Sequence, residues 1–349
     1  MLNTSDIVDL RSDTVSHPTE SMRKEMAKAS VGDDVYGEDP MVNQLEMISA
    51  QKMGKEAGLF IPSGTMGNLA AVLAFCDRGD EVILGNLSHT FLLEAGGIAA
   101  LGGVHPFTIQ NQPDGTLSLD DIRSAIRTED HHFPSTKLIT LENTHNRCGG
   151  RALTLEYTNL VGQIAKEHDL RLHIDGARIF NAATALETPV SELVQPADSI
   201  TFCLSKGLCA PVGSVLCGSG QFIHRARRIR KQLGGGMRQA GIIAAAGIVA
   251  LEEMIDRLER DHTRAQYLAQ GITQIDGLSI DGEMPQTNMV FLTVAKEIGK
   301  TAQIIADGLT EHGIKVSVVG PQRIRMVTHY WINDAGIEKT INGFQKLVR

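Results

Sequence analysis

The chain lacks the features that define several large classes of protein. No stretch approaches the roughly 20 apolar residues of a membrane span, and the polar N-terminus has no apolar core of a signal peptide. Its 33 basic and 41 acidic side chains give a net charge of -8, which argues against nonspecific nucleic-acid binding. The five cysteines include no C-x-x-C pair, so free thiols in a reducing compartment explain them better than disulfides or zinc. We therefore expect a cytoplasmic protein with no metal site.

The chain instead carries a regular alternation of short apolar runs and amphipathic stretches. With 349 residues, of which 42% are hydrophobic, it is long enough for more than one folded domain. Alternating strands and helices predict an α/β fold with a largely parallel sheet covered by helices on both faces. We expect a large domain over residues 1–250, including an N-terminal arm, and a smaller α+β domain over 251–349. The predicted strands of the large domain are Leu59–Ile61, Glu81–Leu84, Lys137–Leu141, Leu170–Ile174, a run from Ser199, and Val212–Cys217.

The apolar run that begins at Ser199 ends in Lys206, and small or turn-forming residues follow at once. A lysine where a buried strand stops is partly desolvated, which favours its neutral, nucleophilic amine. Such an amine can form a Schiff base with an aldehyde. The alternative for Lys206 alone is a lysine that simply reaches from a strand end into water.

Other chemically suggestive groups follow other predicted strands. The turn Ser63–Thr65 precedes a helix, so it is either a phosphate cradle or only a helix cap. His89 and Asp175 each follow a strand, and ligands of parallel sheets bind beyond the carboxyl ends of the strands. A lysine, a phosphate cradle, a carboxylate for the ring nitrogen and a stacking ring are what pyridoxal phosphate requires. Together these residues predict a pyridoxal 5'-phosphate site.

Two further segments allow more than one interpretation. The acidic, turn-rich segment 31–40 holds Tyr36, and it is either a surface loop or the lip of an active site. The helix predicted around Phe222–Leu233 has an apolar stripe, and its basic residues are expected on a solvated or subunit-contacting surface. Those basic residues are Arg225, Arg227, Arg228, Arg230 and Lys231.

Several long and unusual motifs resemble those of the low-specificity L-threonine aldolases, fold-type-I pyridoxal phosphate enzymes of the β-eliminating lyase group. They run through nearly the whole chain: DLRSDTV, VGDDVYGEDP, PSGTMGN, SHTF, LENTHNR, HIDGARIFNA, CLSKGLCAPVGS, LGGGMRQAG and IRMVTH. The resemblance implies a PLP-dependent transferase-like fold of type I, with a mostly parallel sheet between helices and a smaller C-terminal α+β domain. It also implies a homotetramer, a dimer of dimers.

The resemblance also implies roles for individual residues in binding the cofactor. Lys206 would be the Schiff-base lysine, Asp175 the partner of the ring nitrogen and His89 the stacking ring. Gly64 and Thr65 would lie at the phosphate. Arg178 would contact the phenolic oxygen of the cofactor.

The remaining implied roles concern the substrate and a neighbouring subunit. Ser12 and Arg325 would bind the substrate carboxylate, although Arg325 alone would be interpreted as a surface arginine at a strand edge. His132 would lie near the β-hydroxyl of the substrate. Lys231 and Arg238 would reach the site from a neighbouring subunit, or they are only charges on the surface of a helix.

The implied reaction is cleavage of L-threonine or L-allo-threonine to glycine and acetaldehyde. His89, His132 or a water molecule would take the β-hydroxyl proton. An aldolase for another β-hydroxy amino acid such as phenylserine, or a β-eliminating lyase, stays open, because the pocket around Tyr36, Phe91 and His132 would decide. A noncatalytic pyridoxal phosphate carrier is a third hypothesis. A Rossmann dehydrogenase is disfavoured, since no G-x-G-x-x-G follows a strand.

Overall fold

A computed structural model of the chain describes residues 7–348. Of these, residues 7–17 and 256–348 form one compact unit, and Pro18–Ile255 form the other. The predicted domains, 1–250 and 251–349, differ from these units because they assign the N-terminal residues to the large domain. Which parts of the chain fold independently stays a prediction. Among the described residues, no helix combines the length and apolar character that crossing a bilayer demands.

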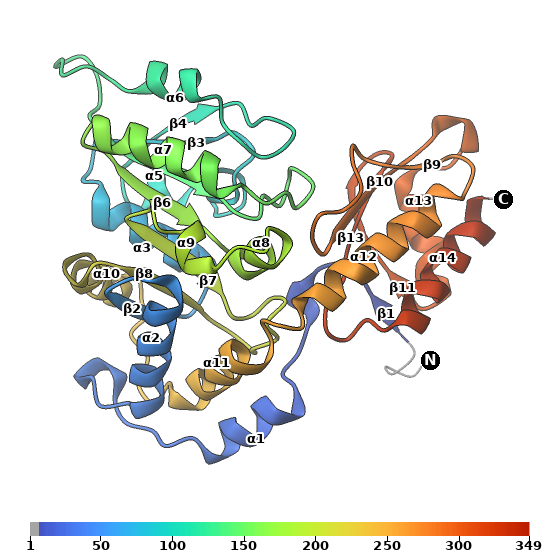
Figure 1. Cartoon of the computed structure of the whole chain (residues 1–349), viewed down its shortest axis with the longest axis horizontal. Helices are drawn as coiled ribbons and strands as arrows, with labels where there is room; N and C mark the ends of the chain where they lie inside the picture. The colour runs from blue at the N-terminus through green and yellow to red at the C-terminus, as the bar shows by residue number, and fades with distance from the viewer. Residues whose placement is uncertain (1–6, 349) are drawn as a thin grey trace. The chain divides into compact units, whose positions relative to one another are not determined.

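The larger unit is built on a seven-stranded sheet in the order β2-β8-β7-β6-β5-β3-β4 (Figure 1). Only β8 runs antiparallel to its neighbours, β2 and β7, so β2 points the same way as β7. The predicted, mostly parallel sheet is confirmed, although the edge strand β4 was not predicted. The strands are β2 (Ala57–Ile61), β3 (Glu81–Gly85), β4 (His105–Ile109), β5 (Thr136–Glu142), β6 (Arg171–Asp175), β7 (Ser199–Cys203) and β8 (Ser214–Gly218).

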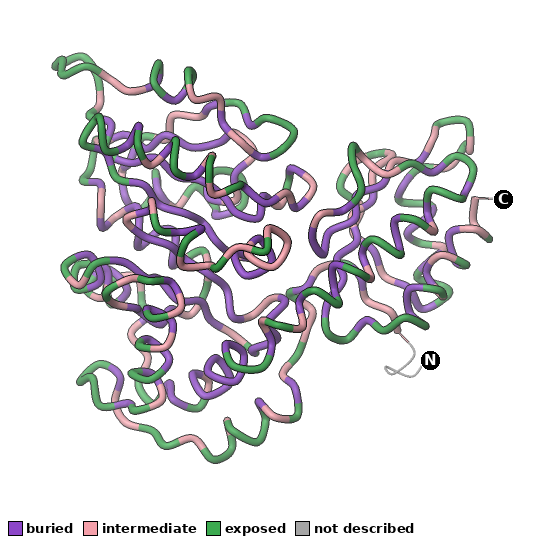
Figure 2. Tube along the Cα trace, in the orientation of Figure 1, coloured by how far each residue is buried: buried purple, intermediate pink, exposed green. Residues whose placement is uncertain are grey.

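Helices cover both faces of this sheet, which explains why β3, β7 and β8 are buried along their whole length (Figure 2). Helices α3, α5 and α10 pack on one face, and α2, α7 and α9 pack on the other. The helices are α1 (Glu20–Lys28), η3 (Asp34–Tyr36), α2 (Pro40–Met53), α3 (Gly64–Phe75), α4 (His89–Leu92), α5 (Gly97–Ala100), α6 (Leu119–Ala125), α7 (Leu155–Glu167), α8 (Ile179–Ala185), α9 (Val190–Leu193), α10 (Gly220–Gln232) and α11 (Gly241–Glu253).

Helix α3 follows β2 directly, as the sequence predicts. The Ser63 hydroxyl accepts a hydrogen bond from the Met66 N–H at 3.2 Å and caps the N-terminus of the helix. The prediction that Gly79 ends this helix is wrong, because α3 ends at Phe75. The backbone of Cys76 is already extended, with φ -114° and ψ 141°.

Helix α10 contradicts the predicted surface position of one of its basic residues. Arg230 is only 2% exposed, and its guanidinium donates to Asp34 Oδ2 at 2.7 Å and to the Phe60 carbonyl at 2.8 Å. Its side chain points inward because a buried carboxylate and a strand carbonyl meet it there. Arg230 therefore fastens the segment that carries Tyr36 to the body of the larger unit.

The smaller unit packs helices against an antiparallel sheet in the order β12-β13-β10-β9, and β1 pairs in parallel with β11. The strand predicted over residues 314–319 is two strands, because β11 and β12 pair with different partners. Buried Phe344, Leu268 and Val290 belong to its core. The elements are β1 (Val8–Asp9), η2 (Asp13–Val15), α12 (Leu258–Thr273), β9 (Leu278–Ile280), β10 (Met289–Val294), η4 (Lys296–Ile298), α13 (Ala302–Glu311), β11 (Ile314–Lys315), β12 (Ser317–Gly320), β13 (Arg323–Val327) and α14 (Asp334–Val348).

The close approach of α3 to β7 depends on Gly67. A Cβ atom at this position would lie 2.6 Å from the Thr201 Cγ2, so helix and strand would have to separate. We expect Gly67→Ala to lower the free energy of unfolding by about 1–3 kcal/mol in urea titrations. Gly97→Ala is the matched control, since its Cβ would meet Leu69 at an ordinary 3.6 Å. Equal losses in both variants would contradict this explanation.

Candidate active site

The groups predicted from the sequence gather at one edge of the seven-stranded sheet. Strands β3, β5, β6 and β7 are parallel, and β2 has the same direction, so their carboxyl ends lie along one edge. The turn at Ser63 follows β2, His89 follows β3, Asp175 ends β6 and Lys206 follows β7. This edge is where open α/β sheets bind ligands.

Lys206 lies in the turn beyond β7. The strand ends at Cys203, three positions earlier, and the Lys206 carbonyl accepts a hydrogen bond from the Cys209 N–H at 2.9 Å. Lys206 is half-buried. Because β6 and β7 are neighbours, with Asp175 opposite Thr201, the lysine and the carboxylate follow adjacent strands.

His89 begins α4 and is held at two points. Its backbone N–H donates to Glu142 Oε2 at 2.7 Å, and its ring Nδ1 lies 2.8 Å from Glu94 Oε1. The hydrogen bond to Glu94 raises the pKa of His89 above its ordinary value, and the charge of Asp175 acts in the same direction. Burial and the positive charge of Lys206 oppose this rise. The charges of Asp175 and Lys206 thus both act on the pKa of His89, in opposite directions.

Two residues that the sequence analysis missed join His89 to Asp175. The Asn68 side-chain amide donates to Glu94 Oε1 and to Asp175 Oδ2, each at 2.8 Å. Asn68 is 1% exposed and Glu94 5%. Burial raises the pKa of Glu94, and the charge of Asp175 adds to this effect. Asn68 belongs to the quoted PSGTMGN motif, but no sequence pattern linked it to Glu94.

The network continues below the sheet edge through His173. Its Nε2 lies 3.2 Å from Asn68 Oδ1, and its Nδ1 lies 2.8 Å from the Ser199 hydroxyl. Burial lowers the pKa of His173 to about 4, although the charge of Asp175 pulls it upward. His173 is therefore a neutral member of the network near pH 7.

The turn before α3 suits an anion. The first N–H groups of a helix lack partners within the helix, and those of Gly64 and Thr65 stand at this end. A Cβ at Gly64 would lie 3.0 Å from Cys203 Sγ, so the backbone here passes close to the end of β7. Arg178, which is 7% exposed, stands at the N-cap of α8, three residues after Asp175. An acid, a half-buried lysine and an anion-binding turn at one edge fit pyridoxal phosphate.

Ser12 and Arg325 come together within the smaller unit. The Ser12 hydroxyl accepts from the Thr14 N–H and caps η2. The Arg325 guanidinium donates to the carbonyl of Arg11, the residue before Ser12, at 3.1 Å. The structure therefore brings the two predicted carboxylate ligands to the same segment.

Tyr36, Lys231 and Arg238 are exposed. Tyr36 ends η3 and is 75% exposed, as expected of either a surface loop or a lip. Arg238 pairs with Asp33 at 2.9 Å, and Lys231 lies in the last turn of α10. Their proposed contacts with substrate or cofactor stay predictions.

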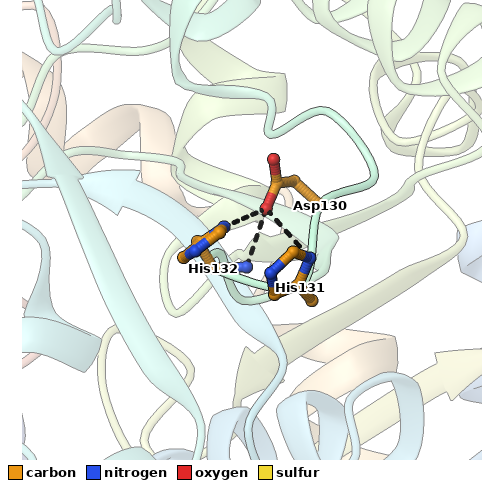
Figure 3. Close-up of side chains that lie close together, drawn as sticks. All are labelled: Asp130, His131 and His132. Atoms are coloured by element: carbon orange, nitrogen blue, oxygen red, sulfur yellow. Dashed lines mark hydrogen bonds and ion pairs between the residues drawn. The ribbon is translucent and has the colours of Figure 1, made fainter.

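His132 lies on an exposed loop between α6 and β5. Its Nδ1 is 2.7 Å from Asp130 Oδ1, and the ring of His131 stands beside it (Figure 3). The three side chains face one another, with the His132 side chain 71% exposed. The structure does not bring His132 into the buried network around His89, and its role at the substrate stays a prediction.

The low pKa of His173 predicts a loss of stability in acid. As pH falls below about 6.5, the unfolded chain protonates this histidine, whereas the folded chain does not until about pH 4. His173 therefore contributes its full share of the unfolding free energy above about pH 6.5, and this contribution is lost as the pH falls from about 6.5 to about 4. We expect His173→Asn to flatten the change in unfolding free energy between about pH 7 and pH 5. His168→Asn, at an exposed histidine, is the control. If the unfolding free energy changed equally with pH in both variants, His173 would not be the source of the loss of stability in acid.

Comparison with known proteins identifies the family of the chain. Residues 9–297 match the family described as Beta-eliminating lyase. The chain is 50% identical over 343 residues to the probable low-specificity L-threonine aldolase 2 of Arabidopsis thaliana, covering 97% of each. It is 45% identical over 323 residues to the low specificity L-threonine aldolase of Escherichia coli (strain K12), covering 93% of this chain and 94% of the relative.

Solved structures show the same fold at lower identity. The threonine aldolase of Leishmania major superposes with a TM-score of 0.85 at 21% identity, covering 98% of this chain and 100% of that one. A putative L-allo-threonine aldolase from Listeria monocytogenes EGD-E gives 0.81 at 22% identity, covering 99% and 98%. The expected fold is confirmed, and the chain belongs to the β-eliminating lyase family and, within it, to the low-specificity L-threonine aldolases.

Proposed function

We propose that the chain is a pyridoxal phosphate-dependent aldolase that cleaves L-threonine and L-allo-threonine to glycine and acetaldehyde. The observation that carries this proposal is the gathering of Lys206, Asp175, His89 and the Ser63 turn at one sheet edge. Relatives about half identical to the chain bear the name of this activity.

The residues of the larger unit would hold the cofactor. Lys206 Nζ would bind its aldehyde carbon, and Asp175 would keep the ring nitrogen protonated. His89 would stack on the ring, the N–H groups of Gly64 and Thr65 would bind the phosphate, and buried Arg178 would meet the phenolic oxygen. When bound, pyridoxal phosphate supplies an electron sink for the electron pair of a breaking bond at Cα.

The chain's own groups would position the substrate and move its protons. Ser12 and Arg325 would bind the substrate carboxylate and so hold the Cα–Cβ bond in the orientation in which it can break. A base takes the β-hydroxyl proton as this bond breaks, so Cβ leaves in acetaldehyde. Cα then gains a proton and leaves in glycine. His89, His132 or a water molecule could be the base, and Tyr36 would border the side-chain pocket.

A coupled assay tests the proposal. Purified protein supplied with pyridoxal phosphate should release acetaldehyde and glycine in equal amounts from at least one threonine diastereomer. The absence of acetaldehyde from both would refute it.

The same assay separates the related activities. A higher kcat/KM for phenylserine than for threonine would indicate that the preferred substrate is another β-hydroxy amino acid. Release of pyruvate from L-cysteine would indicate a β-eliminating lyase. Cofactor absorbance without turnover of any of these would indicate a carrier.

We also propose a cytoplasmic homotetramer in which Lys231 and Arg238 reach a neighbouring subunit's site. The exposure of Lys231 and Arg238 supports a contact with a neighbouring subunit. The five buried free cysteines support the reducing cytoplasm. Light scattering should give four times the chain mass, and a monomer would refute the shared site.

A further inference from the structure

The two carboxylate oxygens of Glu94 have different surroundings. Oε1 lies 2.8 Å from both Asn68 Nδ2 and His89 Nδ1. Oε2 is buried and has no hydrogen-bond partner among residues 7–348. Burying an ionised carboxylate costs free energy unless hydrogen bonds or an opposite charge compensate it. Asn68 and His89 provide this compensation, since both donate to Oε1, and they hold the Glu94 side chain in position.

The directions of the hydrogen bonds in this network follow from which groups can donate. Asn68 Nδ2 faces Glu94 and Asp175, and only its two amide hydrogens satisfy both carboxylates. Its Oδ1 must then accept from His173 Nε2–H, so His173 Nδ1 accepts from the Ser199 hydroxyl. The Asn68 amide thus has one allowed orientation, and this orientation fixes both carboxylates relative to each other.

We propose that Glu94 is a positioning residue, which holds the His89 ring with Nδ1–H toward Oε1, and that Asn68 locks Glu94 to Asp175. Nε2 is then the ring nitrogen of His89 that does not contact Glu94, and it is the nitrogen that would face a substrate. The assignment of a role to His89 rests on the proposed function, whereas the orientation of its ring does not.

The charged groups that face His89 affect the pH at which its ring loses a proton, and this pH can be measured. Glu94 and Asp175 stabilise its charged form, Lys206 opposes it, and Glu142 accepts the His89 backbone N–H. Replacing Glu94 by glutamine keeps the size of the side chain and removes one of the two favourable charges. The His89 ring should then lose its proton at a lower pH.

The test is a pH titration of the full chain labelled with ¹³C at histidine Cε1 and free of cofactor. The His89 signal is identified by its loss in His89→Gln. We expect its midpoint to move to lower pH in Glu94→Gln, and Glu94→Asp, which keeps the charge, to restore part of the shift. His105, which pairs with buried Glu81 at 2.9 Å, is the internal control, and its signal should be the same in every variant.

The pH profile of kcat/KM for threonine gives a second, independent measurement on the holoenzyme. The limb that His89 controls should move in the same direction as the titration. A His89 titration in Glu94→Gln that superimposes on that of the unchanged chain would overturn the positioning role, even if the enzyme cleaves threonine. A shifted titration without threonine cleavage would refute the proposed function and leave the positioning role standing.

Discussion

Lys206→Ala is expected to reduce threonine cleavage by roughly a thousandfold or more, since it removes the only group proposed to bond to the cofactor aldehyde. The substitution shortens a half-buried side chain in a turn, so the fold should survive. The absorbance band of the lysine-bound cofactor should disappear together with turnover. Steady-state kinetics and absorbance spectra at saturating cofactor measure both effects.

Lys137→Ala is the matched control for this experiment. Lys137 lies on β5, the neighbour of β6, and is exposed, so its loss should change neither the spectrum nor turnover. Full activity in Lys206→Ala would contradict the assignment, as would equal losses in both variants.

Arg230→Met is expected to lower the free energy of unfolding by about 3–5 kcal/mol, because it leaves a buried carboxylate without its counter-charge. Asp34 and Arg230 are 3% and 2% exposed. The substitution also leaves the Phe60 carbonyl without its arginine donor. Urea unfolding followed by circular dichroism measures the loss, and the segment that carries Tyr36 should open first.

Arg225→Met on the same helix is the control. Arg225 pairs with Asp77 at 2.8 Å, but both side chains are more than half exposed. Exposed pairs contribute about 0–1 kcal/mol, so this variant should unfold almost like the unchanged chain. Similar losses in both variants would show that burial of the Arg230 pair has no special effect.

The edge of the sheet that carries the site could be predicted from the sequence. Local patterns suffice there, because an apolar strand followed by a turn brings a polar residue to the carboxyl end. Lys206, Asp175 and His89 were found in this way. The mostly parallel sheet follows from the same alternation of strands and helices.

Contacts between residues far apart in the chain could not be predicted in this way. Asn68 meets Asp175 across 107 positions, and Arg230 meets Asp34 across 196. Nothing in the residues near Arg230 distinguishes it from the exposed arginines of the same helix. The buried position becomes visible only when the fold brings the acidic segment against α10. The role of His132 comes from the family resemblance and not from a local pattern, and the exposed position of its side chain neither supports nor excludes that role.

The most direct test of the account is to trap the cofactor on the chain. Sodium borohydride reduces the C=N bond between a lysine and pyridoxal phosphate to a stable amine, so peptide mass mapping can locate it. We predict a phosphopyridoxyl group on Lys206, and none on Lys137 or Lys231. A label on another lysine, or no label on a chain that cleaves threonine, would contradict it.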